Sequence, residues 1–190
     1  MSGLPFQFVI PGTPAPGGSK TAIPARRGKQ GPLVIKNQRI VGNAVYGHPV
    51  MMMIDAGGAG NVKWKKACAA AVQKHWHHPP LEGPLILEVT FVVARPKNHY
   101  RTGKFSSELR IDAPVVPFAG ARSAPDVTKL GRSTEDALTQ AKLWNDDCQV
   151  VEQMFRKVFA KSASKTGAIV RVSEWSPLTS LFTRKESSNV

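Results

Sequence analysis

A short region between residues 125 and 151 carries acids at a spacing that suits metal and phosphate chemistry. Asp126 follows Pro125 at the start of a predicted helix, and Asp147 lies 21 residues later, at the start of a predicted strand. From those positions the two carboxylates can converge on one point. Two or three converging carboxylates on a phosphate-binding surface are what a hydrolytic Mg²⁺ site requires.

The net charge of the chain gives these acids added weight. Its 190 residues include 26 Lys and Arg against 13 Asp and Glu, for a formal charge of +13. Such an excess of positive charge favours a polyanionic partner, above all nucleic acid. Acids oppose that binding unless they pair with surface cations or hold a metal ion, so an acidic pattern in this chain indicates a candidate site.

Composition also limits the class of protein. The length predicts one domain that is large enough to bury a core. No run of about 18 apolar residues is present, so we expect no membrane partner. Cys68 and Cys148 cannot form a disulfide framework, and prolines interrupt the N-terminal segment where a signal peptide would need an apolar run. These features predict a cytoplasmic protein with reduced thiols.

The elements that must position the acids follow from hydrophobic periodicity. Alternating apolar residues predict strands, and apolar residues three and four apart predict helices, the first of them capped by Asn61. The order β, α, β, α, β, β predicts an α+β fold, with helices packed over a sheet and a polar tail at 176–190. In chain order the elements are strand 6–10, helix 61–75, strand 85–94, a helix from 125, strand 150–159 and strand 168–175.

The acidic region resembles the RusA family of Holliday-junction resolvases. The shared pattern is Pro-Asp-x-x-Lys-Leu-x-Arg, then Asp-Ala-Leu, then Asp-Asp-x-Gln-Val, and its halves agree in residue type and in separation. The resemblance is close over residues 125–151 and loose elsewhere. It implies a small homodimeric endonuclease, often carried by phages and prophages, which nicks four-way DNA junctions in recombination and repair.

The resemblance also implies the setting of this chemistry. The fold would be a mixed sheet with helices packed on it, in a single domain over residues 1–175. Mg²⁺ would be the cofactor, with Mn²⁺ as an alternative, and no small-molecule cofactor would be needed. The partners would be four-way or branched DNA and a second copy of the chain, in the cytoplasm of a bacterial host cell.

The resemblance assigns roles to particular residues. Asp126 and Asp147 would hold the metal ion, because the essential acid of the family is the second of the Asp146–Asp147 pair. Arg132 stands where the family has a Lys or Arg beside the metal. A cation there could hold the scissile phosphate or stabilise the developing charge.

Thr128 departs from the family pattern, which has an acid at this position. A hydroxyl is a neutral and weaker Mg²⁺ ligand than a carboxylate. Three outcomes stay open: the site works with two acids and more water, Asp136 or Asp146 compensates, or the chain binds junctions without cutting them.

Each candidate also has a purely structural interpretation. A lone Asp126 would be an ordinary helix N-cap. Arg132 would form an i,i+4 ion pair with Asp136. Lys129 and Lys157 match basic positions of the family, where we expect phosphate contacts, although solvated surface lysines would look the same.

Two long segments, 14–60 and 95–124, show little periodicity and many Lys and Arg residues. We interpret both as flexible basic loops that contact DNA, with only a short hairpin suggested near 33–45. The DNA-binding cations assigned to these loops are Lys20, Arg26, Arg27, Arg101 and Lys104.

Three smaller features favour structural roles. The His75–His78 cluster lacks a third metal ligand at a recognisable spacing. Residues 57–60 are Gly-rich without the Lys-Ser/Thr of a phosphate loop, and predict a flexible linker. Residues 51–53 are three methionines, which we place in the core or at a dimer seam.

Two rival functions remain at this stage. One is a junction- or duplex-binding protein whose site is inactive because of Thr128; it predicts structure-selective binding without cutting. The other is a general nucleic-acid binder with an accidental resemblance; it predicts no preference for junctions and no effect of Asp126→Asn or Asp147→Asn.

Overall fold

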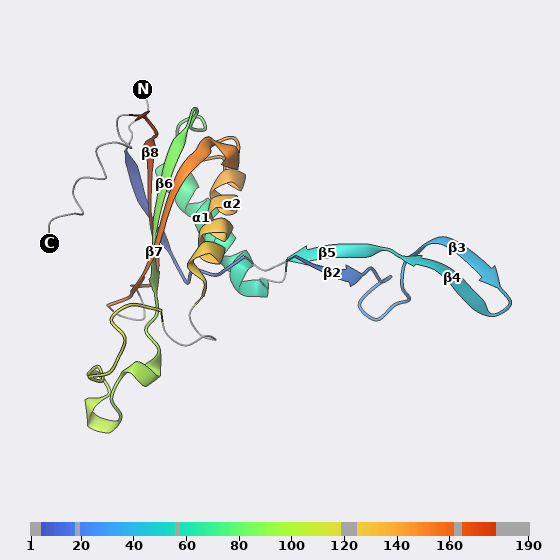
Figure 1. Ribbon diagram of the computed structural model, residues 1–190, viewed down its shortest axis with the longest axis horizontal. Helices are drawn as coiled ribbons and strands as arrows, with labels where there is room; N and C mark the ends of the chain where they lie inside the picture. The colour runs from blue at the N-terminus through green and yellow to red at the C-terminus, as the bar shows by residue number, and fades with distance from the viewer. Residues whose placement is uncertain (1–4, 18–19, 56–57, 119–124, 162–164, 178–190) are drawn as a thin grey trace.

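The computed structural model describes residues 5–17, 20–55, 58–118, 125–161 and 165–177. A four-stranded sheet forms the body, and two helices cover one of its faces (Figure 1). β6 and the edge strand β7 are parallel, and the other neighbours are antiparallel. In spatial order the strands are β1 (Phe6–Pro11), β8 (Gly167–Glu174), β6 (Leu85–Val93) and β7 (Val150–Phe159). The predicted mixed α+β architecture is confirmed.

The core lies between the sheet and the helices α1 (Gly58–His75) and α2 (Val127–Gln140). Every second residue of β6 from Leu85 to Phe91 is buried, as the alternation predicted. On the helices, apolar side chains three and four residues apart point at the sheet. The buried residues on these faces are Trp64, Cys68, Ala71 and Val72 on α1 and Leu130, Thr134, Ala137 and Leu138 on α2.

Buried hydrogen bonds join the two helices. The Trp64 indole donates to the Thr134 hydroxyl at 3.0 Å, and the Ser133 hydroxyl donates to the Asn61 side-chain oxygen at 2.6 Å. Asn61 is therefore not the N-cap that the sequence predicted, because α1 begins three residues earlier at Gly58. Residues 58–60 of the expected linker form the first turn of the helix instead. A buried polar side chain that bridges two helices looks like a cap when only the sequence is read.

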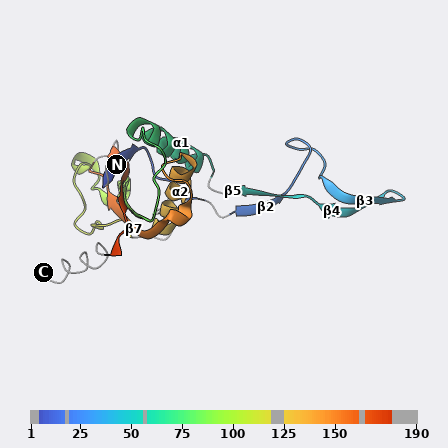
Figure 2. The ribbon, with the colours of Figure 1, turned by 90° about the horizontal axis from the view of Figure 1, so that it is seen from above.

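A two-stranded β arm replaces most of the flexible loop predicted over 14–60. Strands β2 (Lys20–Pro24) and β5 (Met51–Asp55) pair next to the body, and β3 (Ile35–Val41) and β4 (Ala44–Pro49) pair further out. Figures 1 and 2 show this arm projecting away from the sheet and helices. The hairpin suggested near 33–45 is confirmed.

The sequence concealed the arm because its strands have no buried face. The described side chains of β3 and β4 are exposed except for the partly buried Ile35, so no alternation of apolar and polar residues marks them. Met51 and Met52 are about half exposed on β5, so their predicted place in the core is wrong. The Met53 side chain lies outside the described part.

The second predicted loop, 95–124, is an ordered lobe as far as residue 118. It contains two short 3-10 helices, Lys97–His99 and Gly103–Phe105, and a bridge between Tyr100 and Leu109. The Arg95 guanidinium lies 4.0 Å from the centre of the Phe159 ring and donates to the Pro114 carbonyl at 2.7 Å. Residues 119–124, and the part of the predicted tail from 178 to 190, lie outside the described residues.

The close approach of α2 to β7 leads to a prediction about stability. A Cβ atom on Gly131 would overlap the ring of Phe155. Helix propensity alone favours Ala over Gly by about 1 kcal/mol. We expect the steric cost to win, so that Gly131→Ala lowers the free energy of unfolding by roughly 1–2 kcal/mol in urea titrations.

The matched control places Gly131→Ala in a Phe155→Leu background, where the ring is absent. There the substitution should be neutral or stabilising. Equal destabilisation in both backgrounds would show that the contact with Phe155 is not what excludes a side chain.

Candidate active site and nucleic-acid interface

Asp126 caps the N-terminus of α2. Its backbone is extended, with φ −60° and ψ 130°, and its Oδ1 accepts a hydrogen bond from the Thr128 amide at 2.9 Å. The side chain is exposed. The structural role expected of a lone Asp here is confirmed. The cap engages Oδ1 in a bond that an asparagine side chain could also make.

Cations surround this end of α2. The Lys157 ammonium, on β7, donates to the Pro125 carbonyl at 2.9 Å, one residue from Asp126. Lys129 and Arg132 are exposed on the first turns of the helix, where a phosphate could reach them. The predicted ion pair between Arg132 and Asp136 does not occur among the described residues.

Asp147 lies in the 3-10 helix Asp147–Gln149 (η3), immediately before β7. It is exposed, and Asp146 caps this short helix by accepting from the Cys148 amide at 2.9 Å. That hydrogen bond lowers the pKa of Asp146. The Gln149 side chain completes a capping box by accepting from the Asp146 amide. Asp146 is thus engaged in holding the turn that presents Asp147.

Glu135 is an acid that sequence reasoning missed. Burial, followed by the charges of Asp147 and Asp136, raises its pKa to about 7. Its carboxylate accepts from the Gln153 side chain of β7 at 2.6 Å. No motif marks Glu135, because its environment is created by the packing of α2 against β7.

The structure does not bring Asp126 and Asp147 together within one chain. β7 runs back along α2, so that Lys157 lies at Pro125 and Gln153 lies at Glu135. η3 precedes β7 and is therefore at the opposite end of α2 from Asp126. A helix of 14 residues is about 20 Å long. The contacts of β7 thus place the two acids toward opposite ends of α2 in one subunit, whereas the sequence predicts that they converge.

The arm begins beside the Asp126 end of α2. The Gly17 amide donates to the Lys129 carbonyl at 3.2 Å, and a Cβ atom on Gly17 would lie 3.5 Å from that of Ser133. The lobe that follows β6 extends from the same end of the body, in a different direction from the arm (Figure 1). The start of α2 therefore lies at the corner between two extensions.

The lobe is less cationic than its sequence suggested. Arg101 pairs with Glu108 at 2.7 Å, and Arg110 pairs with Asp112 at 2.8 Å, which lowers the pKa of that Asp. A cavity of about 560 Å³ nevertheless opens between the lobe and the end of β7, with three cations in its wall. Its lining includes Arg95, Lys97, Tyr100, Arg101 and Ser106.

Comparison with known families decides the class of protein. The family model for endodeoxyribonuclease RusA matches residues 36–172, well over half of the chain. The chain belongs to the RusA endodeoxyribonuclease family. No curated protein matches the chain.

Membership of the RusA family fixes the general activity. The RusA endonucleases are metal-dependent nucleases that act on Holliday junctions, so DNA is the substrate class. The rival of an accidental resemblance is thereby excluded. Over the described residues, no helix combines the length and the apolar character that a membrane crossing requires.

The acids of one RusA-like chain do not fit a complete magnesium site. Asp126 and Thr128 lie at one end of α2, and Asp147 lies at the other. Among the described residues, no three His, Cys, Asp or Glu side chains gather closely enough to hold an ion. The donor set seen in one chain is thus incomplete for a hard divalent cation, which prefers several oxygen ligands.

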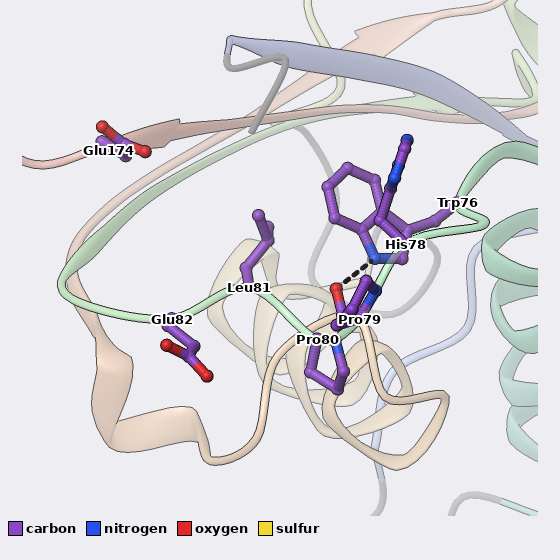
Figure 3. A pocket seen from close by; sticks show the side chains of 7 residues that line it. All are labelled: Trp76, His78, Pro79, Pro80, Leu81, Glu82 and Glu174. Atoms are coloured by element: carbon purple, nitrogen blue, oxygen red, sulfur yellow. Dashed lines mark hydrogen bonds between the residues drawn. The ribbon is translucent and has the colours of Figure 1, made fainter. Parts of the chain in front are cut away.

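A second cavity, of about 290 Å³, lies at the end of the body where α1 stops (Figure 3). Trp76, His78, Leu81 and two glutamates line it, and the Trp76 indole donates to the Pro79 carbonyl at 3.1 Å. This cavity is at the opposite end of the sheet from the lobe and has acids rather than cations in its wall. It is unsuited to a DNA phosphate.

The raised pKa of Glu135 predicts a pH-dependent stability. The folded pKa, about 7, exceeds the usual 4.5, so the proton is bound more tightly in the folded state. The stability that the protonated Glu135 side chain gives to the folded state is fully present below pH 4.5, and it is lost as the pH rises through 7. Glu135→Gln should therefore match the wild type near pH 4.5 and exceed its free energy of unfolding by about 1 kcal/mol at pH 8, after allowance for solvent screening.

Urea unfolding at both pH values measures the difference. Glu152→Gln, at an exposed glutamate of the neighbouring β7, is the matched control and should show the same small difference at both. If Glu135→Gln raises the free energy of unfolding by the same amount at both pH values, the raised pKa of Glu135 is not the cause.

Proposed function

We propose that this chain resolves four-way DNA junctions as a homodimer, by paired symmetric nicks placed at the α2 N-terminus of each subunit. The observation that carries this proposal is the position of Asp126. It is an exposed carboxylate at the corner between a basic arm and a basic lobe, in a member of a junction-resolving family. A two-fold dimer suits a four-way junction because two symmetrically placed strands must be cut.

The residues around Asp126 have different proposed roles toward the scissile phosphate: some bind the metal ion, and others bind the phosphate itself. The Asp126 carboxylate is the proposed catalytic group and the first candidate ligand for Mg²⁺ or Mn²⁺. The Thr128 hydroxyl is a weaker candidate ligand beside it. When bound, the metal would lower the pKa of a water so that hydroxide is available near neutral pH. Arg132 and Lys129 project from the same turns of α2 and would hold the scissile phosphate and its neighbour. Lys157 fixes the entry to the helix through the Pro125 carbonyl.

Asp147 keeps its proposed catalytic role only with help from a second subunit. Asp147 lies near Glu135, about 14 Å along the helix from Asp126, so the same phosphate is out of reach within one chain. β7 is a ten-residue edge strand with no proline, and no other strand of the described residues pairs with its outer edge, where a second chain could bind. Glu135 and Asp136 lie near Asp147 and would add negative charge to that end.

The central test separates the capping role of Asp126 from its proposed chemistry. Asn can cap a helix, so Asp126→Asn should retain wild-type stability, whereas Asp126→Ala should lose about 1 kcal/mol. Both should lower the rate of cutting of a synthetic mobile junction by at least about 100-fold. If Asp126→Asn cuts at the wild-type rate, Asp126 has no catalytic role and acts only as a helix cap.

A mixing experiment tests the contribution of Asp147. Asp126→Asn and Asp147→Asn homodimers should each be inactive, and mixed dimers should recover part of the cutting if the partner subunit supplies Asp147. The Glu152→Gln variant, at an exposed acid of β7, is the control. Full activity of Asp147→Asn alone would remove this residue from the site.

Metal removal and replacement of Thr128 complete the account. EDTA should abolish cutting and leave junction binding intact, and Mg²⁺ or Mn²⁺ should restore the nicks.

If the missing acid at Thr128 limits the cutting rate, Thr128→Asp should raise that rate above the wild type. Thr128→Val, which adds no metal ligand, should not raise it. Binding without any cutting by the wild type, at any of these metals, would favour the inactive binding protein.

A further inference from the structure

The β arm carries basic residues from its root to its tip, and its single acid, Asp55, lies at the root opposite Lys20. Between Lys20 and Ile54 the chain contains six Lys and Arg residues and no Asp or Glu. In a chain with 13 acids, so long a segment without one is a marked segregation of charge. The cations are Lys20, Arg26, Arg27, Lys29, Lys36 and Arg39, and all of those with a described side chain are exposed.

The shape of the arm matches a groove of duplex DNA. It is a ribbon of two strands, and the major groove of B-DNA, about 12 Å wide, admits such a ribbon. Strands β2 and β3, of five and seven residues, follow one another along the arm and extend roughly 40 Å. That is close to the length of one turn of B-DNA, about 34–36 Å.

The outer hairpin carries apolar side chains that are exposed in the described part of the chain. Opposite residues of an antiparallel pair share a face, so the pairs Arg39–Tyr46 and Val41–Ala44 lie on one face of the tip. Tyr46 is 59% exposed and Val41 is 53% exposed. A two-stranded ribbon is marginally stable alone in water, so an aromatic and a valine beside a cation indicate a surface that binds.

From these observations we infer that the arm binds a duplex arm of the junction in its groove, with the Arg39–Tyr46 face of the tip against the base edges. The basic residues nearer the body contact phosphates, and the apolar tip contacts groove atoms such as thymine methyl groups. This inference rests on the proposed function and adds the part of the substrate that the arm recognises. Charge argues against a second arm as the partner, because two ribbons of six cations would repel each other.

The root of the arm ties this binding to the candidate active site. Gly17 is hydrogen-bonded to Lys129 on the first turn of α2, next to Asp126. A duplex that lies along the arm therefore passes the end of α2 where cutting is proposed. The arm would set the distance between the branch point and a bound stretch of duplex about one helical turn long.

Binding in EDTA, where the nuclease is inactive, tests the inference by the salt dependence of affinity. Arg26→Gln/Arg27→Gln should weaken binding to a junction about 10-fold or more and lower the slope of log affinity against log salt by about 1.8, at roughly 0.9 for each phosphate contact. The matched control is Lys74→Gln/Lys142→Asn, which removes two charges at the opposite end of the helices. It should change neither quantity beyond the general effect of net charge.

The tip requires a different signature. Val41→Ser/Tyr46→Ser should weaken binding about 10-fold with an unchanged salt slope, because an apolar groove contact releases no counterions. Ile40→Ser/Val45→Ser alters the opposite face of the same tip and should stay within about twofold of the wild type. Equal losses in both tip variants, or no loss in either, would overturn the groove assignment.

Two further outcomes separate this inference from its foundation. If the wild type does not prefer a junction to an equal mass of linear duplex, the proposed function fails together with the inference. If the wild type prefers the junction but the variants of the arm bind as tightly, only the inference about the arm fails. A change in sedimentation of the free protein caused by Val41→Ser/Tyr46→Ser would instead identify a second copy of the chain as the occupant.

Discussion

The packing of α2 between α1 and β7 is the constraint on which the site and the DNA surface depend. Leu130, Thr134 and Leu138 are buried, and the Trp64 indole is hydrogen-bonded to Thr134 across the helix pair. On the other side, Gly131 leaves just enough room for the Phe155 ring. A helix held on both sides cannot rotate or slide, so Asp126 is fixed at one end and the environment of Glu135 at the other.

This arrangement separates charge along the molecule. The arm and the start of α2 carry an excess of cations, and Asp126 is an exposed acid beside them. The other end of α2 gathers Glu135, Asp136, Asp146 and Asp147, and the mutual repulsion there contributes to the raised pKa of Glu135. The resulting field would steer a DNA backbone toward the arm and lobe and away from the acidic end. An exposed acid beside an excess of cations is where a phosphate and a metal ion can both be accommodated.

The sequence predicted the elements that bury a face and failed for those that do not. β6 and α1 have clear periodicity because one side of each lies against the core, and both elements were predicted. The arm has no buried face, so its strands looked like loop. Asp126 was placed correctly because Pro-Asp is a local signal for a helix start. Its separation from Asp147 is a property of topology, since β7 returns antiparallel along α2, and spacing in sequence carries no such information.

Photo-crosslinking from the start of α2 would test the central claim most directly. Cys68 is buried, so a crosslinker attached at Thr128→Cys in a Cys148→Ser background reports on the Asp126 end alone. Bound to a four-way junction in EDTA, this probe should crosslink the backbone at or next to the branch point, on two symmetry-related strands. Crosslinks that fall only far from the branch point, or none at all from a protein that still binds the junction, would contradict a catalytic site at the start of α2.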